Sequence, residues 1–353
     1  MRQYFLDDDQ CQDLQNIIRG VYAPLRGYLR EPDYKSVLEQ MRLSGGEPWP
    51  IPIVLDIDSD DANRFSSGKD ILLSDINGRP VARLVNPDIY KYDKTEFVKK
   101  VFGTLDENHP GVKQVFSMKD YLLGGEIVSM SAQEASEKSS PAYIKQLFKD
   151  KGWKTIVAFQ TRNAPHLSHE YLQKLALENV DALFIQPVIG KKKLGDFKDE
   201  VIIDTYKLII DKYYSRDRVH FDVLPLAMRY AGPREAVFHA LIRKNFGCTH
   251  MIIGRDHAGV GSYYDPYDAH KIFDNFTEDE LGIKILKFDN AFHCNDCKGL
   301  VTEDKCGHST DSRLYLSGTQ IRQMIKNKEE LPEEFMRKEV SKYLINHSNP
   351  FVG

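Results

Sequence analysis

Apolar and polar positions change their spacing near residue 150, which divides the chain into two kinds of pattern. Before that point, short apolar or alternating runs over residues 52–57 and 70–76 are separated by turn signals such as Asn77-Gly78. Runs of this kind are typical of strands joined by hairpins. One helix is expected around residues 8–18. The first part of the chain is therefore predicted to be a β-rich domain with a few helices.

After residue 150, apolar runs of strand length alternate with patterns of helical period. The expected strands cover 155–160, 181–190, 219–226 and 249–254, and the expected helices cover 170–180, 201–214 and 233–247. This alternation predicts an α/β fold with a parallel, doubly wound sheet, and ligands of such sheets bind at the carboxyl ends of the strands.

Two further features complete the expected organisation. A charged, serine-rich stretch at 131–143 indicates a linker, and helical patterns at 317–327 and 333–347 indicate a small unit at the end of the chain. We expect three domains, at residues 1–145, 146–290 and 291–353.

The composition narrows the classes of partner. Lys and Arg total 48 against 52 Asp and Glu among 353 residues, a formal net charge of -4. This balance disfavours bulk attraction to nucleic acid or to an anionic membrane, so any anion site must be local. No apolar run approaches the roughly 18–20 residues of a membrane span, and the acidic N-terminus is unlike a signal peptide. We expect a cytoplasmic protein without nucleic-acid or membrane partners.

Polar side chains crowd the junction between the strand expected at 155–160 and the helix that follows it. Gln160, Arg162 and Asn163 come at the strand end, and His166 and His169 are spaced to share one face of the helix near its N-terminus. Free N–H groups and the helix dipole favour anions there, so the two imidazoles can hold phosphate oxygens. The alternative is that the histidines cap the helix and Arg162 is a surface cation. The order His-Leu-Ser-His-Glu does not fit the zinc-protease motif.

A second cluster, Gly254 to Gly259 (GRDHAG), stands in the same relation to the strand at 249–254. Gly254 would let the backbone approach a ligand, Arg255 brings a cation and His257 an imidazole. The alternative is a structural turn. The sequence has neither a P-loop nor a Gly-x-Gly-x-x-Gly motif after the first strand of the sheet, which leaves nucleotidyl transfer as the favoured chemistry.

A cysteine cluster follows in the stretch CNDCKGLVTEDKCGH. Cys294, Cys297, Cys306 and His308 offer three thiolates and one imidazole, a set that suits tetrahedral zinc. Four protein ligands leave no open position, so the predicted zinc site is structural. The alternative is a loop with free thiols.

Two other segments allow more than one interpretation. Ser317 or Thr319 can cap the helix expected at 317–327, and with Gln320 and Arg322 can complete a phosphate site, or act as caps alone. The basic run at 191–196 is either a surface loop or a ligand loop.

The motifs, taken in order, resemble the sulfate adenylyltransferase (ATP sulfurylase) family. They are Gln160-Thr161-Arg162-Asn163 with His-x-x-His, RYAGPREA at 229–236, GRDHAG and SGTQIR at 317–322, and the similarity also includes residues 22–29, 49–57 and 103–112. The resemblance implies a PUA-like N-terminal domain, a Rossmann-like catalytic domain of the HIGH-type nucleotidyltransferases, and a small zinc-bearing C-terminal unit. Without a P-loop, no fused adenylyl sulfate kinase is expected.

The resemblance also implies a reaction. Sulfate would attack the α-phosphorus of ATP in line, giving adenylyl sulfate and pyrophosphate, with Mg²⁺ accompanying ATP. The same chemistry serves sulfate activation or, reversed, sulfur oxidation. A homodimer or higher homo-oligomer is expected, and related enzymes include forms with zinc at the position of the cysteine cluster.

The family's site residues carry over to matching positions of this chain. The sulfate contacts are Gln160, Arg162 and the backbone at Ala258. The catalytic positions are Thr161, Arg162, Asn163, His166 and His169. The nucleotide contacts are Gln160, Asn163, Gly254, Arg255, Asp256, His257, Phe288 and Ala291, the last two by position near the adenine.

The chain departs from the family at two places, and two other functions stay open. Leu167-Ser168 stands where relatives often have Arg-Ala, and Tyr22-Ala23 where they have Phe-Ser. One alternative is an adenylyltransferase for a phosphorylated acceptor, which the pair Gln160 and Arg162 disfavours. The other is a zinc-stabilised RNA-binding module, which the acidic charge and the lack of a basic stripe disfavour.

Overall fold

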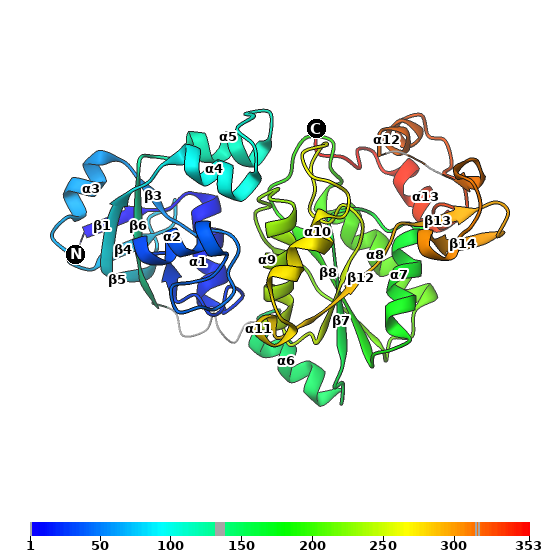
Figure 1. The fold of residues 1–353 in the computed structure, drawn as a ribbon, viewed down its shortest axis with the longest axis horizontal. Helices are drawn as coiled ribbons and strands as arrows, with labels where there is room; N and C mark the ends of the chain where they lie inside the picture. Colours follow the sequence, from blue (N-terminus) through cyan, green and yellow to red (C-terminus); the bar gives the residue numbers. More distant parts are fainter. Residues whose placement is uncertain (1, 131–137, 315, 317) are drawn as a thin grey trace. The chain divides into compact units, whose positions relative to one another are not determined.

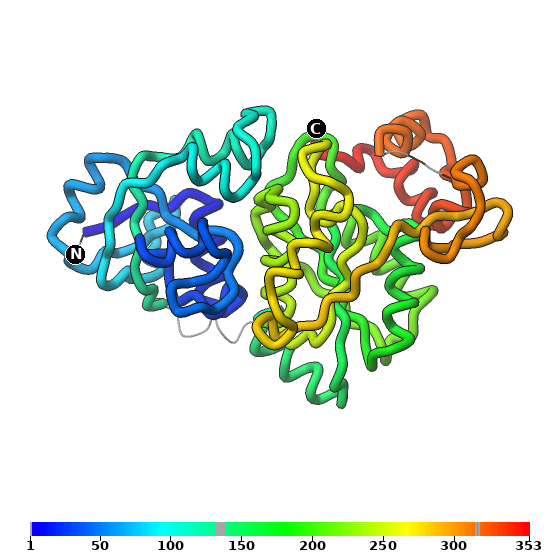
Figure 2. Tube along the Cα trace, in the orientation of Figure 1, coloured from blue at the N-terminus to red at the C-terminus, as the bar shows by residue number. Residues whose placement is uncertain are grey.

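The chain folds into two units, each built from segments that are separated in the sequence. The computed structural model describes residues 2–130, 138–314, 316 and 318–353 (Figure 1). The N-terminal unit comprises residues 1–152, 226–247 and 256–284, and the sheet unit comprises residues 153–225, 248–255 and 285–353. Figure 2 follows the chain through these segments in sequence colours. The predicted division into three domains stays a prediction.

The N-terminal unit is built on a mostly antiparallel sheet with strand order β1-β4-β5-β6-β2, in which β3 also pairs with β6. Only the β1–β4 pair is parallel among the strand pairs described for this sheet. The strands are β1 Arg2–Phe5, β2 Gly27–Tyr28, β3 Asp56–Ile57, β4 Ile71–Ser74, β5 Pro80–Lys91 and β6 Tyr121–Ser129. The helices are α1 Asp8–Ile18, α2 Glu31–Gln40, α3 Ser59–Phe65, α4 Lys94–Phe102, α5 Pro110–Ser117, α6 Pro141–Asp150, α9 Pro233–Asn245, α10 Asp268–Lys271 and α11 Glu278–Leu281.

Local sequence signals explain several of these boundaries. The helix expected around residues 8–18 is α1, which begins after a capping box formed by Asp7 and Gln10. The hairpin from β4 to β5 turns at Gly78, whose φ of 80° suits glycine, and the Asp75 carboxylate accepts the Asn77 N–H. The Asn-Gly turn signal is thus confirmed.

Two predictions for the first part of the chain need correction. The apolar run at 52–57 is strand only at Asp56–Ile57, although Ile53 and Leu55 are buried. Pro50 and Pro52 lack the N–H groups that a sheet ladder needs, so the run enters the core as irregular chain. Of the predicted linker, residues 131–137 lie outside the described part of the chain, and Pro141–Asp150 is a helix.

The sheet unit contains the predicted parallel sheet, with strand order β10-β8-β7-β11-β12 and β9 beside β8. The pairs of β7 with β8 and β11, and of β8 with β9 and β10, are parallel. The strands are β7 Ile156–Thr161, β8 Ala182–Ile189, β9 Val219–Phe221, β10 Leu224–Pro225, β11 His250–Ile253 and β12 Lys284–Lys287. The helices are α7 Leu167–Leu177, α8 Asp199–Tyr213, α12 Gly318–Lys326 and α13 Lys338–Asn346.

Two elements of this unit differ from the sequence-based expectation. The strand expected at 219–226 is two short strands, because the chain breaks at Asp222, whose carboxylate accepts the next backbone N–H. The last helix begins at Lys338 instead of residue 333, since Pro332 to Met336 forms a turn with hydrogen bonds from Phe335 and Met336 to Pro332.

A small antiparallel sheet carries the cysteine cluster. It consists of β13 Ala291–Cys294, β14 Gly299–Thr302 and β15 Arg313–Leu314, in the order β14-β13-β15.

Among the described helices of the whole chain, none has the length and apolar character of a membrane span.

Candidate active site and metal centre

The end of β7 presents the first group of predicted residues. Gln160 and Thr161 are the last residues of the strand, and Gln160 is paired in register with the buried Gln186 of β8. The Thr161 hydroxyl accepts the Asn163 N–H at 3.1 Å, which forms the tight turn after the strand. Gln160 and Arg162 are half-buried, whereas Asn163 is exposed. The predicted position at the carboxyl end of a central strand is confirmed.

The two histidines lie at the start of α7 and stack on each other. His166 is the N-cap residue by backbone geometry, but its ring makes no capping hydrogen bond. Instead its Nδ1 is 2.9 Å from the Ser168 hydroxyl, and its ring centroid lies 3.6 Å from that of His169 with 29° between the planes. The alternative that the His166 side chain caps the helix is therefore wrong, and the two rings share one face as predicted.

Aromatic neighbours enclose this pair and keep it neutral. Phe335 stacks on His166 with centroids 5.3 Å apart, and Phe159 meets His169 edge-on at 5.3 Å. Burial lowers the pKa of His166 to about 4. Burial, and then the neighbouring His166, hold the pKa of His169 well below its ordinary value. Both rings are uncharged at neutral pH in the free protein.

His169 also carries an unsatisfied atom. Its Nδ1 is buried, and no hydrogen-bond partner in the described part of the chain reaches it. A buried polar atom without a partner costs about 1–3 kcal/mol, and a bound ligand that supplied the partner would recover that cost. The atom marks this face of α7 as ready for a polar ligand.

Gly254 and Arg255 follow β11 at the same sheet edge, because β11 runs parallel to β7. A Cβ added at Gly254 would only touch the Leu172 side chain at 3.9 Å, which is ordinary contact. The protein's own packing therefore does not require glycine here. Arg255 is exposed. The predicted reason for Gly254, close approach of a ligand to the backbone, fits this open space.

Phe288 and Ala291, the two residues assigned by position near the adenine, are part of the packed interior of the sheet unit. The Phe288 N–H donates to the Ile253 carbonyl at the end of β11 at 3.0 Å, and its side chain packs against the core of the sheet unit. Ala291 is buried at the start of β13. Their nucleotide roles stay predictions.

The remainder of GRDHAG belongs to the N-terminal unit and forms a strained turn. Asp256 and Ala258 both have left-handed backbone, with φ of 56° and 58°. The Gly259 N–H donates to the Asp256 carbonyl, and a Cβ at Gly259 would lie 1.9 Å from the Asp256 carboxylate. Non-glycine residues in this conformation are uncommon and gather at functional sites. The segment is thus a turn, as the alternative interpretation proposed. Turns of this kind also direct backbone N–H groups toward anions.

A buried polar network lies behind this turn within the N-terminal unit. His257 Nε2 is 3.1 Å from Nδ1 of the fully buried His239 of α9, and His239 Nε2 lies 3.7 Å from Glu235. The Glu235 carboxylate accepts the N–H groups of Arg229 and Ala231.

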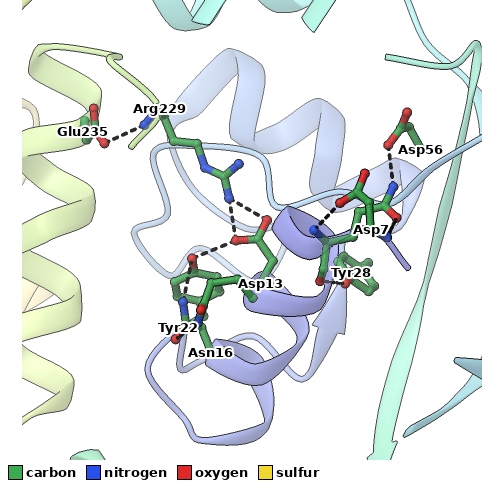
Figure 3. A network of polar contacts seen from close by, with 10 residues as sticks. Asp7, Asp13, Asn16, Tyr22, Tyr28, Asp56, Arg229 and Glu235 are labelled. Atoms are coloured by element: carbon green, nitrogen blue, oxygen red, sulfur yellow. Dashed lines mark hydrogen bonds and ion pairs between the residues drawn. The ribbon is translucent and has the colours of Figure 1, made fainter. Parts of the chain in front are cut away.

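The network continues to α1 through a buried ion pair. The Arg229 guanidinium donates to both oxygens of Asp13, at 2.6 and 2.5 Å, and the Tyr22 hydroxyl donates to the same carboxylate (Figure 3). Sequence reasoning identified residues 229–236 only by resemblance and missed these roles. Charged residues within an apolar helical pattern indicate buried polar contacts, but the partners of these residues lie far away along the chain.

The cysteine cluster has the geometry of a metal site. Nδ1 of His308 lies 3.6, 3.3 and 3.8 Å from the sulfurs of Cys294, Cys297 and Cys306, and all four donor atoms lie within 4.8 Å of one another. Donors of tetrahedral zinc, with Zn–S near 2.3 Å, are about 3.5–3.8 Å apart. The Cys297 N–H hydrogen bond lowers the pKa of the Cys294 thiol to about 7. The residues therefore fit zinc, and the side chains come together as predicted.

The two ambiguous segments are partly explained. Ser317 lies outside the described residues, and α12 begins at Gly318, with the Thr319 hydroxyl 3.5 Å from Arg322. In the basic run, Lys192 is buried by its ion pair with Asp199 at 2.5 Å and by its hydrogen bond to the Phe197 carbonyl. Lys192 is thus a structural residue of its loop.

Comparison with known proteins extends the picture from the site to the whole chain. The family described as ATP-sulfurylase matches residues 136–347, and a PUA-like domain family matches residues 1–132. The chain belongs to the ATP-sulfurylase family. The predicted fold, a PUA-like β-rich domain followed by a parallel-sheet catalytic domain and a Cys/His cluster, is confirmed.

ATP-sulfurylase relatives match nearly the full length of the chain. The sulfate adenylyltransferase of Pyrococcus abyssi is 50% identical over 98% of this chain and 91% of its own. That of Ignicoccus hospitalis is 49% identical over the same shares. Among solved structures, the hexameric APS kinase from Thiobacillus denitrificans has a TM-score of 0.74 at 21% identity, over 99% of this chain and 64% of that chain. The structural match concerns the fold alone.

Proposed function

We propose that this ATP-sulfurylase catalyses ATP + sulfate = adenylyl sulfate + pyrophosphate, in either direction. The observation that carries the proposal is the match of nearly the whole chain, at about half identity, to relatives named sulfate adenylyltransferase. The polar end of β7, beside the paired histidines of α7, supports it with suitable chemistry.

Sulfate is a weak nucleophile that is already ionised, so catalysis depends on positioning and charge instead of a general base. Holding two reactants in line can lower a barrier by about 7–11 kcal/mol, and one preorganised oxyanion donor contributes about 3–4 kcal/mol. The planar guanidinium of Arg162 suits a tetrahedral oxyanion. We assign the sulfate contacts to Gln160, Arg162 and the backbone N–H of Ala258.

The histidines would act on the phosphates. Their rings are neutral in the free protein, and a phosphate anion beside them would favour the protonated form. The imidazole N–H groups of His166 and His169 would donate hydrogen bonds to phosphate oxygens as negative charge grows on the departing pyrophosphate. We assign Thr161, Arg162, Asn163, His166 and His169 to catalysis, and Gln160, Asn163, Gly254, Arg255, Asp256, His257, Phe288 and Ala291 to the nucleotide.

Two metals belong to the proposal. Mg²⁺ bound with ATP would neutralise phosphate charge. Zinc would be held by Cys294, Cys297, Cys306 and His308 as a structural ion, because four protein ligands leave no position for a substrate. The cytoplasmic location and a homodimeric or larger assembly stay predictions.

The test measures pyrophosphate release from ATP and sulfate, and ATP formation from adenylyl sulfate and pyrophosphate, both with Mg²⁺. Arg162→Ala is expected to lower kcat/KM at least about 100-fold, because it removes a charged oxyanion donor. The matched control is Arg216→Ala, which removes an exposed arginine of the sheet unit that pairs with Asp211. The proposal would be refuted if folded wild-type protein had no activity in either direction. Turnover of a phosphorylated acceptor in place of sulfate would favour the alternative adenylyltransferase.

A further inference from the structure

The segment before α13 is part of the hydrophobic core of the sheet unit. Leu331 and Met336 of this segment, and Val340 of α13, are almost completely buried in one cluster with Val157 and Phe159 of β7. The segment therefore packs in the same core as the central strand β7. Its contacts with α7 therefore link that helix to the same core.

Phe335 of this segment contacts the start of α7 in two ways. Its carbonyl accepts the Leu167 N–H at 2.8 Å, which takes up one of the donors that a helix N-terminus leaves open. Its ring stacks on His166 with 21° between the planes. The backbone next to His166 and one face of its imidazole are thus set by Phe335.

A buried ion pair holds the end of the first turn of the helix. Glu170, which directly follows His169, is only 4% exposed. Arg337 donates to both of its oxygens, from Nε at 2.9 Å and from the terminal nitrogen at 2.6 Å. Lys174 donates to the same carboxylate at 2.5 Å. Burial raises the pKa of the Glu170 carboxyl, but the hydrogen bonds from Arg337 and Lys174 outweigh burial and leave the pKa below its ordinary value.

Arg337 is itself fixed by a second set of contacts. Its guanidinium lies 4.1 Å above the Tyr213 ring of α8. The Tyr213 hydroxyl donates to Glu339 at 3.0 Å, and Lys212 pairs with the same carboxylate at 2.9 Å. A planar guanidinium that stacks and donates two parallel bonds has little freedom to move. The bond to Glu170 therefore ties the first turn of α7 to Arg337 and, through Arg337, to α8.

We propose that Arg337, acting through Glu170, is a positioning residue that holds His166 and His169 in their stacked arrangement toward the phosphates. His169 lies between two anchors, the Leu167 N–H at Phe335 and the Glu170 carboxylate at Arg337, and His166 directly precedes the first anchor and stacks on His169. This inference rests on the proposed function for the phosphates, but the arrangement of the rings can be tested without it.

The kinetic test compares Arg337→Gln with the wild type. Glu170 keeps Lys174 as a partner in this variant, so the fold is expected to survive, and thermal denaturation verifies that it does. We expect kcat to fall about 10- to 100-fold, the loss typical of misplaced catalytic groups, while KM for sulfate stays unchanged. Glu170→Gln should behave alike, and the double variant should be no worse than the poorer single variant, because both act through one contact.

The spectroscopic test observes the rings directly. In protein labelled with ¹³C-histidine, stacking shifts the ring signals of His166 and His169, which are assigned with His166→Gln and His169→Gln. Arg337→Gln is expected to move both signals toward unstacked values. This measurement needs no turnover, so an inactive wild type would refute the proposed function and leave the positioning inference to be decided here.

The matched control is Lys338→Gln, which removes an exposed ion pair between the first residue of α13 and Glu333. It should change neither kcat nor the histidine signals. The inference is overturned if Arg337→Gln lowers only thermal stability, with kcat of the folded enzyme and both ring signals unchanged. Additive losses in the double variant would equally overturn the route through Glu170.

Discussion

His166 and His169 show how packing at the scale of single residues decides charge. Each ring contacts the other and one phenylalanine, so water is displaced from the faces of both. Displacing water penalises the protonated form, which is why both pKa values fall. The sequence could place the pair on one helical face from its spacing, but it could not foresee Phe335, which lies more than 160 residues further along the chain.

The lowered pKa of His166 predicts how the free protein responds to acid. An ordinary histidine takes up a proton near pH 6.5, whereas His166 does so only near pH 4. Between these values the unfolded chain binds a proton that the folded chain does not, so the free energy of unfolding falls as pH drops through this window. Allowing for its partial exposure, we expect His166 to account for about 1–2 kcal/mol of that fall.

Urea unfolding of the wild type and of His166→Gln at pH 4.5, 5.5 and 7.5 measures this contribution. The variant should lose less stability on acidification, whatever its stability at neutral pH. His347→Gln, a change at the C-cap of α13, serves as the control. Parallel curves for the wild type and His166→Gln would show that His166 is not held neutral.

At the scale of helices and strands, the structure follows the apolar period of the sequence where side-chain burial determines the element. It departs from that period where backbone hydrogen bonding determines the element. The helices α8 and α9 and the strands β7, β8 and β11 lie where the apolar spacing predicted them, and α7 lies about three residues earlier than the predicted range 170–180. The run at 52–57 starts at Pro52, two residues after Pro50, and is a strand only at its end, whereas the strand at 219–226 breaks where the Asp222 side chain accepts a backbone N–H. Such backbone competition is invisible to hydropathy.

The small sheet of β13, β14 and β15, which carries the cysteine cluster, should depend on its metal for stability. Among the described residues, the buried apolar cluster around it comprises Phe292, Cys294 and Cys306, with Val301 packed alongside. So small a core is insufficient to hold three short strands, and in comparable sites metal binding supplies folding free energy.

We therefore expect about one zinc per chain, and its loss in Cys297→Ser. Atomic absorption measures the metal, and limited proteolysis between β13 and β15 measures the local structure with and without a chelator. Cys11→Ser, which changes a cysteine outside the cluster, should retain zinc. Metal-free wild-type protein with unchanged proteolysis would contradict the prediction.

At the scale of the whole molecule, the N-terminal unit is completed by segments that come much later in the chain. Arg234 donates to the carbonyls of Val37, Leu38 and Pro50, and Arg229 pairs with Asp13. Periodicity assigned residues 226–247 to the parallel-sheet pattern, because a helix between two strands was the simplest interpretation. This helix contacts the N-terminal unit through Arg234 and through Phe238, which packs against Tyr22 and Trp49, and these partners could not be inferred from spacing.

The Asp13–Arg229 pair makes a prediction at this scale. Both side chains are nearly enclosed, at 7% and 15% exposure. Arg229→Met leaves Asp13 buried without its cation, which typically costs about 3–5 kcal/mol. Asp13→Leu combined with Arg229→Met should recover part of that loss, because no charge is then left unpaired. Chemical denaturation of the two variants and of Arg216→Met as an exposed control tests this, and a loss no larger than that of the control would contradict it.

The same pair has a consequence for synthesis. Asp13 and Arg229 are 216 residues apart, so at about 5–20 residues per second the ribosome delivers the cation roughly 10–40 s after the carboxylate. Until then the nascent N-terminal segment holds a carboxylate that its finished interior can accept only when paired. The final packing of this unit must wait for translation to pass residue 284, which sets a period during which its interior is incomplete.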